Sequence, residues 1–158
     1  MNVRNSMTKD PVTCQAGDLI SDVAGIMRNK KIGGLPILEG EQLVGIVTET
    51  DIIKLLMTKG PSDDLWLPSP LEIIEVPVRE FFNWEHSKKA LADIRNKKIS
   101  EIMSHPVITV EPEDDIETAA SKMLDKKIDR LCVVEKGRLI GIITREDIVW
   151  SLAGGKNV

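Results

Sequence analysis

The sequence predicts an α/β (α+β) protein made of two tandem β-α-β-β-α units. The first observation behind this prediction is an internal repeat. When the chain is shifted by 96 residues, residues 3–56 align with residues 99–152 without a gap, and 18 of the 54 pairs are identical. The second is composition. Ile, Val and Leu number 46 against five aromatic residues, which is typical of β-branched sheets covered by helices.

The sequence of each unit predicts the same secondary-structure elements in the same order. A short strand comes first, followed by a helix whose apolar residues recur every three or four positions, a β-hairpin, and a second helix. We expect Asp18 and Asp114 to be the N-caps of the first helices. One unit has too little core to fold alone, so the two units should pack sheet to sheet. The strands are expected at 11–14, 35–38, 43–47, 107–110, 131–134 and 139–143, and the final helices at 50–57 and 146–153.

Composition excludes several classes of protein. The net charge of −4 argues against a nucleic-acid binder, which needs a basic face. No apolar run reaches the roughly 18 residues of a membrane span. The first ten residues contain no apolar signal-peptide region, and two cysteines make no disulfide framework. These features predict a cytoplasmic protein that binds neither nucleic acid nor membrane.

Residues 58–98 separate the repeats, which we place at 1–57 and 99–158. This connector holds four of the eight prolines and four of the five aromatic residues. Ser69-Pro70-Leu71-Glu72 predicts a helix start, and Asn83 a cap for a helix that ends at Arg95, with Trp84, Leu91 and Ile94 on one face. Aromatic side chains are costly in water, so we expect the connector to pack on the repeats; a docking patch for a partner protein is the alternative.

Thr and Asp stand three residues apart after the last strand of each repeat, in GIVTETD (Thr48, Asp51) and GIITRED (Thr144, Asp147). This spacing at a helix start predicts a capping box, the commonest reason for the pattern. A carboxylate in that place also lies where sheet-and-helix folds bind nucleotides, and it could accept hydrogen bonds from both ribose hydroxyls. The two roles are compatible.

The paired units, these two phrases and the strand phrases GLPIL and DRLCVV resemble the CBS-domain family, named for cystathionine β-synthase and found also in inosine monophosphate dehydrogenase and the γ subunit of AMP-activated kinase. The resemblance covers both repeats. It implies two repeats packed about a pseudo-two-fold axis, called a Bateman module, with two clefts between them. Such clefts commonly bind AMP, ATP or S-adenosylmethionine.

The resemblance also implies roles for individual residues. Asp51 and Asp147 would contact ribose, with Thr48 and Thr144 beside them. Arg130 would cross to the cleft of Asp51 and meet phosphate. Backbone near Val12, Thr13, Ile32, Gly34, Leu35, Ile108, Thr109, Ile128 and Leu131 would line the adenine pockets.

The two clefts are expected to differ. Gly33-Gly34 stands in repeat 1 where repeat 2 has Asp129-Arg130, so the cleft built on that strand of repeat 1 should lack the arginine. Glu49 stands where repeat 2 has Arg145, and a phosphate would be repelled by the first and attracted by the second.

No catalytic or phosphate-loop signature occurs, and we expect the isolated His86 and His105 to be surface or turn residues and not metal ligands. Cys14 and Cys132 are expected to be buried thiols. The sequence therefore predicts a non-enzymatic regulatory module that senses an adenosine-type ligand and requires no cofactor. The alternative is a structural or oligomerisation module with degenerate clefts that docks a partner. The final helices carry apolar stripes that predict a homodimer: Ile52, Leu55, Leu56, Ile148, Val149 and Trp150.

Overall fold

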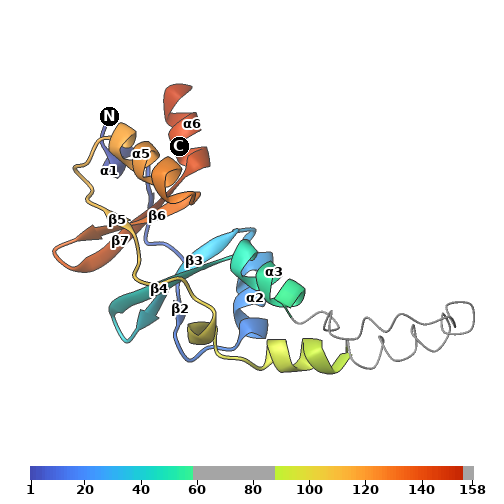
Figure 1. Cartoon of the computed structure of the whole chain (residues 1–158). Helices are drawn as coiled ribbons and strands as arrows, with labels where there is room; N and C mark the ends of the chain where they lie inside the picture. Colours follow the sequence, from blue (N-terminus) through green and yellow to red (C-terminus); the bar gives the residue numbers. More distant parts are fainter. Residues whose placement is uncertain (59–87, 155–158) are drawn as a thin grey trace, which may run out of the picture.

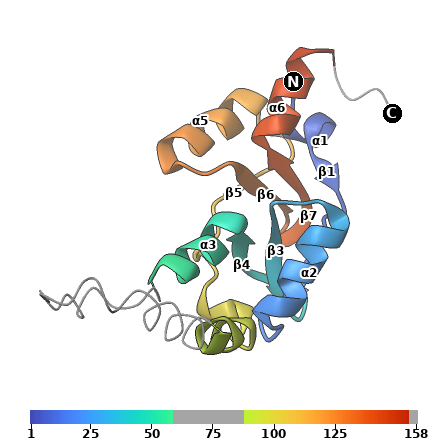
Figure 2. The same cartoon turned by 90° about the vertical axis from the view of Figure 1, so that its right-hand side faces the viewer.

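The computed structural model describes residues 1–58 and 88–154. Two small sheets face each other, and the helices lie on their outer sides (Figures 1 and 2). The sheet of repeat 1 contains β2 (Cys14–Gln15), β3 (Gly34–Glu39) and β4 (Gln42–Thr48) in that order. Strand β2 is parallel to β3, and β3 and β4 form an antiparallel hairpin. Helices α2 (Ile20–Lys30) and α3 (Glu49–Thr58) complete the unit.

Repeat 2 has the same plan. It contains β5 (Thr109–Val110), α5 (Ile116–Lys126), β6 (Arg130–Glu135), β7 (Arg138–Thr144) and α6 (Arg145–Leu152). Its sheet has a fourth strand, because β1 (Thr8–Lys9) pairs antiparallel with β7 and gives the order β1-β7-β6-β5. The prediction of paired β-α-β-β-α units is confirmed.

The segment that leads into each repeat packs on the other repeat. Helix α1 (Val3–Ser6) contacts α5 and α6, and the thioether of Met7 lies where a Cβ on Gly141 would be. The 3₁₀ helix η2 (Ile99–Glu101) lies on repeat 1, where Ile99 N–H donates to the Asp18 carbonyl at 2.7 Å and Met103 packs on Gly45. The two glycines leave space for these methionines. The first residues of each repeat therefore pack on the other repeat and help to hold the two units together.

Each repeat has its own core. The buried residues of repeat 1 are joined by Ile94 from the end of the connector and by Ile99 from the start of repeat 2. Those of repeat 2 are joined by Val3 and Met7 from the N-terminus. The strands β4 and β7 contact each other across the interface between the sheets. The predicted burial of Cys14 and Cys132 is confirmed.

The prediction that Asp18 and Asp114 cap the first helices is wrong. The N-cap residues are Leu19 and Asp115, without a side-chain cap. The carboxylate of Asp18 instead accepts the N–H of Gln15 at 2.9 Å, and Asp114 accepts that of Glu111 at 3.0 Å. Each aspartate therefore closes the turn that joins the first strand to the helix. The first strands are also shorter than predicted, with two residues each.

Most of the predicted connector features lie outside the described residues, including the helix start at Ser69, the cap at Asn83 and the aromatic residues. Residues 88–95 are helical, which agrees with the predicted end at Arg95. Ile94 is only 4% exposed and packs in the core of repeat 1, whereas Leu91 remains 48% exposed. The end of the connector is thus anchored by one apolar side chain.

Candidate functional site: two clefts between the repeats

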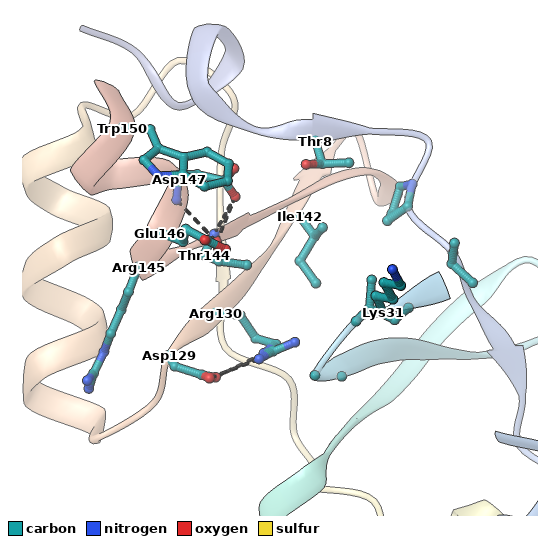
Figure 3. A pocket seen from close by; sticks show the side chains of 15 residues that line it. Thr8, Lys31, Asp129, Arg130, Ile142, Thr144, Arg145, Glu146, Asp147 and Trp150 are labelled. Carbon is teal, nitrogen blue, oxygen red and sulfur yellow. Dashed lines mark hydrogen bonds and ion pairs between the residues drawn. The ribbon is translucent and has the colours of Figure 1, made fainter. Parts of the chain in front are cut away.

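Two hollows open between the repeats, and each contains one of the Thr-Asp pairs. The first, which we name the Asp147 cleft, has a volume of about 510 Å³ (Figure 3). One wall is the start of α6, and the other is the start of β3 together with the loop that precedes it in repeat 1. Its lining is Thr8, Pro11, Val12, Lys31, Ile32, Gly33, Gly34, Asp129, Arg130, Ile142, Thr144, Arg145, Glu146, Asp147 and Trp150.

The second hollow, the Asp51 cleft, has a volume of about 550 Å³. It combines the start of α3 with the loop before β6 and the end of α5. Both volumes fall within the roughly 300–1,000 Å³ of small-molecule sites. The lining of the Asp51 cleft is Ile46, Thr48, Thr50, Asp51, Lys54, Ser104, Pro106, Ile108, Lys126, Lys127, Ile128, Asp129, Arg130 and Arg145.

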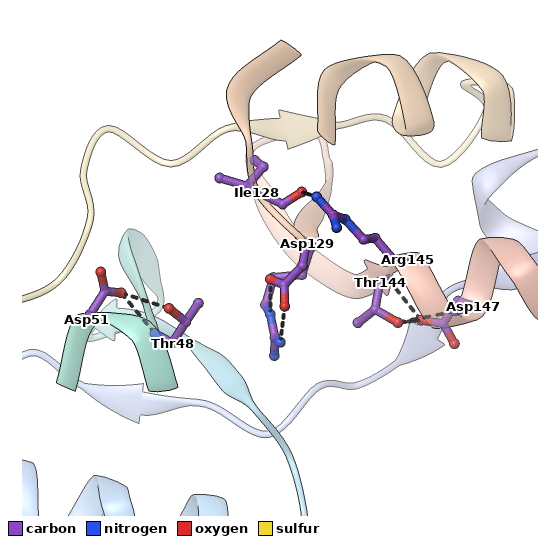
Figure 4. Close-up of polar contacts among 8 residues, drawn as sticks. Thr48, Asp51, Ile128, Asp129, Thr144, Arg145 and Asp147 are labelled. Carbon is purple, nitrogen blue, oxygen red and sulfur yellow. Dashed lines mark hydrogen bonds and ion pairs between the residues drawn. The ribbon is translucent and has the colours of Figure 1, made fainter. Parts of the chain in front are cut away.

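The Thr-Asp pairs cap their helices. In repeat 2 the Thr144 N–H donates to Oδ2 of Asp147 at 2.9 Å, and the Asp147 N–H donates back to the Thr144 hydroxyl at 3.2 Å. In repeat 1 the Thr48 N–H donates to Oδ2 of Asp51 at 2.9 Å. The predicted capping box is therefore confirmed in repeat 2, and in repeat 1 Asp51 reaches back to the Thr48 N–H as predicted. These bonds reach Oδ2 of each Asp, and both side chains lie in the wall of a cleft (Figure 4).

The second carboxylate oxygen of Asp51 has a weak partner. Oδ1 accepts the Ser104 hydroxyl at 3.4 Å, near the limit of a hydrogen bond. Ser104 lies in the first residues of repeat 2, just after η2, and this segment closes one side of the Asp51 cleft. Asp147 is more enclosed, since only 5% of its surface is exposed.

Arg130 lies between the two clefts and lines both of them. Its guanidinium forms a two-pronged ion pair with its neighbour, in which Nε and Nη2 each stand 2.9 Å from a carboxylate oxygen of Asp129. The hydrogen bonds from Arg130 hold the pKa of Asp129 below its usual value. Figure 3 shows Arg130 directed at Asp129, and Figure 4 shows Asp129 between the two Thr-Asp sites. The expectation that one cleft lacks the arginine is wrong, because the side chain reaches the junction of the clefts.

The glycine pair of repeat 1 makes this position possible. A Cβ on Gly33 would lie 3.0 Å from Nη2 of Arg130, and a Cβ on Gly34 would lie 2.9 Å from Nη1. Both distances are tighter than ordinary packing allows. The guanidinium therefore rests on the bare backbone of Gly33-Gly34, and only 12% of the Arg130 side chain is exposed.

The expected contrast between Glu49 and Arg145 is not found. Glu49 is exposed and absent from the lining of either cleft among the described residues. Arg145 lines both clefts, and its guanidinium is 3.5 Å from the Ile128 carbonyl (Figure 4). Any difference between the clefts must come from other side chains.

The residues expected to line adenine pockets divide into two groups. Val12, Ile32 and Gly34 line the Asp147 cleft, and Ile108 and Ile128 line the Asp51 cleft. The others fall outside both linings. Leu35 and Leu131 are fully buried in the cores, Thr13 lines a separate hollow beside the hairpin turns, and the Thr109 carbonyl accepts the Lys122 ammonium at 3.0 Å.

Several lining residues were missed by the sequence reasoning. Lys54 and Trp150 each follow their cleft aspartate by three residues, so they lie one turn further along the same helix face. That spacing was available in the sequence. Lys31, Lys126 and Lys127, at the ends of α2 and α5, were not among the predicted site residues. Lys31 and Lys127 adopt left-handed C-cap conformations, with φ of 54° and 55°, and both line clefts.

Other reactive groups do not form a site. Burial raises the pKa of Cys14 and of Cys132 to about 12, so neither thiol ionises near neutral pH. Among residues 1–58 and 88–154, no group of three His, Cys, Asp or Glu side chains is placed to hold a metal ion. The clefts remain the places where a ligand would meet convergent polar groups.

Comparisons with known proteins agree with this architecture. The CBS domain family model matches the chain twice, at residues 3–58 and 99–154. The protein MJ1426 of Methanocaldococcus jannaschii is 38% identical over 154 residues, which cover 96% of this chain and 91% of that protein.

Two solved structures share the fold. The CBS domain pair of protein MJ0100, crystallised with 5′-methylthioadenosine and S-adenosyl-L-methionine, has a TM-score of 0.70 at 27% identity, with 96% of this chain and 99% of that chain covered. Protein MJ1225 from Methanocaldococcus jannaschii, described as a candidate archaeal homologue of γ-AMPK, has a TM-score of 0.72 at 29% identity. The match covers 96% of this chain but 47% of MJ1225. The chain therefore belongs to the CBS domain family and carries two copies of the domain.

Proposed function

We propose that the chain is a non-catalytic regulatory module that senses an adenosine-type ligand such as AMP, ATP or S-adenosylmethionine. One observation carries the proposal. Each cleft places a helix-capping aspartate opposite strand and loop backbone of the other repeat, with Arg130 between the clefts. The adenosine compounds bound by the related MJ0100 pair support the same class of ligand.

The chemistry of each cleft suits a nucleoside. A ribose has two neighbouring hydroxyls that can donate to one carboxylate, and Asp51 or Asp147 would accept them. The backbone and apolar side chains at Val12 and Ile32, or at Ile108 and Ile128, would take the adenine ring. Arg130 would exchange part of its pairing with Asp129 for a phosphate oxygen, since a guanidinium fork matches phosphate geometry.

Assembly belongs to the same proposal. Leu56, Val149 and Trp150 are 46%, 61% and 45% exposed on α3 and α6, whereas Ile52 and Leu55 pack on the core of repeat 1 and Ile148 on that of repeat 2. We propose that these helix faces form a homodimer and that ligand binding is passed to a partner protein in the cytoplasm. No helix in the described part of the chain has the length and apolar character needed to cross a membrane.

A structural or oligomerisation module with unused clefts is the alternative. Calorimetric titration of the chain with AMP, ATP and S-adenosylmethionine separates the two. Saturable heat with at least one of them supports the sensor. Absence of heat with all three, together with a stable dimer by light scattering, would favour the structural role.

A further inference from the structure

We infer that the two clefts sort adenosine ligands by charge, so that the Asp51 cleft takes a ligand with phosphates and the Asp147 cleft takes one without. This inference rests on the proposed function and names the ligand class of each cleft. It comes from a comparison of side chains at equivalent positions of the two repeats.

The Asp51 cleft is strongly cationic. Five basic side chains line it against two acidic ones, which gives an excess of three positive charges. Three of the basic groups belong to this cleft alone: Lys54 on α3, and Lys126 and Lys127 at the end of α5. Within the described residues none of these three lysines forms a salt bridge, so their ammonium groups are available to phosphate oxygens.

The Asp147 cleft has no such excess. Three basic and three acidic side chains line it. Glu146 replaces Thr50 of repeat 1 in the wall, and its carboxylate lies in the same helical turn as Asp147. Two carboxylates in one turn repel a polyphosphate, and the contribution of Asp147 is the less screened one, because Asp147 is buried whereas Glu146 is exposed.

The remaining difference is aromatic. Trp150 stands at the repeat position of Lys54, so one helix presents an indole ring where the other presents an ammonium group. Figure 3 shows Trp150, Glu146 and Asp147 on one side of the Asp147 cleft and Lys31 on the other. An indole face attracts a flat base or a cation such as a sulfonium, and the two carboxylates favour the same cation.

Groups common to both clefts cannot produce this sorting. Arg130, Arg145 and Asp129 line both of them. The selectivity therefore falls on Lys54 against Trp150, on Thr50 against Glu146, and on Lys126, because Lys127 has its repeat counterpart Lys31 in the Asp147 cleft. Adenosine, ADP and S-adenosylmethionine are the probes that separate these contributions, because they share the nucleoside and differ in charge.

The first test removes positive charge from one cleft. We expect Lys54→Met and Lys126→Ala each to weaken ADP binding by at least fivefold in calorimetric titrations and to leave S-adenosylmethionine binding unchanged within twofold. Lys30→Ala is the matched control, because Lys30 is the repeat counterpart of Lys126, is exposed, and is absent from both linings among the described residues. Lys30→Ala should leave ADP binding unchanged.

The second test reads the other cleft directly. A chain with Trp66→Phe and Trp84→Phe retains Trp150 as its single tryptophan. S-adenosylmethionine should change Trp150 fluorescence saturably, and ADP should not do so at concentrations that saturate its calorimetric site. Glu146→Gln should raise the affinity of the Asp147 cleft for ADP, so that ADP then alters the same fluorescence.

The outcomes are distinct. If wild-type chain binds none of AMP, ATP, ADP and S-adenosylmethionine, the proposed function fails and the sorting fails with it. If both ligands bind, but ADP affinity is insensitive to Lys54→Met and Lys126→Ala, or ADP itself perturbs Trp150 in the chain with native Glu146, the proposed function stands and the sorting is overturned. Circular dichroism of each variant establishes that it is folded.

Discussion

Arg130 rests on Gly34, the residue that occupies its own position in the other repeat. A Cβ on Gly34 would lie 2.9 Å from Nη1 of Arg130, and the two positions differ by the 96-residue repeat. Equivalent positions meet where a pseudo-two-fold axis passes, so two arginines could not both occupy this junction. The asymmetry of the repeats is therefore a packing requirement, and it gives two clefts one shared guanidinium.

Gly34→Ala should destabilise the fold. The added Cβ would also lie 2.6 Å from the Val47 carbonyl oxygen, and overpacking of this kind costs about 1–3 kcal/mol. Urea unfolding measures the effect. Gly25→Ala is the control, because nothing lies within 4 Å of its Cβ in helix α2 and the change there should stabilise by roughly 0.5–1 kcal/mol. Equal stabilities of the two variants would contradict the packing account.

Thr144→Ala should lower the free energy of unfolding by about 1 kcal/mol, since it removes the hydroxyl that accepts the Asp147 N–H. Thr48→Ala should cost less, because the Thr48 hydroxyl donates to Asp51 at the longer distance of 3.3 Å, against 2.9 Å in repeat 2. The comparison is again by urea unfolding. A larger loss of unfolding free energy for Thr48→Ala than for Thr144→Ala would show that hydrogen-bond length does not determine how much each cap stabilises the fold.

Asp51→Asn separates capping from ligand binding. An asparagine retains the size and some hydrogen bonding of the cap, so the stability loss should be about 1 kcal/mol or less. Ligand affinity should fall by more than tenfold, about 1.4 kcal/mol, because the ribose hydroxyls lose a charged acceptor. Asp147→Asn should act on the other cleft with its own ligand. Titrations of both variants that match wild type would leave these aspartates as caps alone.

Arg130→Ala should weaken AMP more than adenosine, since the two ligands differ only in the phosphate that a guanidinium would bind. The measurement is the ratio of AMP to adenosine affinity by calorimetry, in variant and wild type. Because Arg130 lines both clefts, the loss should appear at whichever cleft takes phosphate. An unchanged ratio would exclude a phosphate role for Arg130.

The two thiols should react slowly in the native protein. Burial raises the pKa of Cys14 and of Cys132 to about 12, so the thiolate is scarce at neutral pH and rises only in strong alkali. A colorimetric disulfide reagent at pH 8 should label neither residue over minutes and both in urea. Rapid labelling of the folded chain would show that a core opens locally.

Much of the fold follows from short-range patterns. The hairpins of both repeats lie within one residue of the predicted spans, because aliphatic runs around Glu39-Gly40-Glu41-Gln42 and Lys136-Gly137 admit few alternatives. The helix caps at Asp18 and Asp114 were mistaken because a strand-to-helix turn competes for the same carboxylate. Local sequence does not reveal whether the aspartate carboxylate will accept the amide of the turn or that of the helix start.

The candidate site was also predicted only in part. The Thr-Asp spacing located one wall of each cleft, because a helix start fixes both side chains over the end of a strand. The opposite walls depend on how the repeats pack, and no local pattern shows that Met7 lies on Gly141 or that Arg130 reaches both clefts. Trp150 and Lys54 could have been found by continuing the helix face one turn beyond the aspartates.

The most direct test of the central claim is calorimetric titration of wild-type chain and an Asp51→Asn, Asp147→Asn double variant with AMP, ATP and S-adenosylmethionine. We predict saturable heat in wild type with at least one ligand, and more than tenfold weaker binding of that ligand in the double variant, with the circular dichroism spectrum unchanged. No heat with any ligand, or equal affinity in the two proteins, would contradict the claim that these clefts bind adenosine through their capping aspartates.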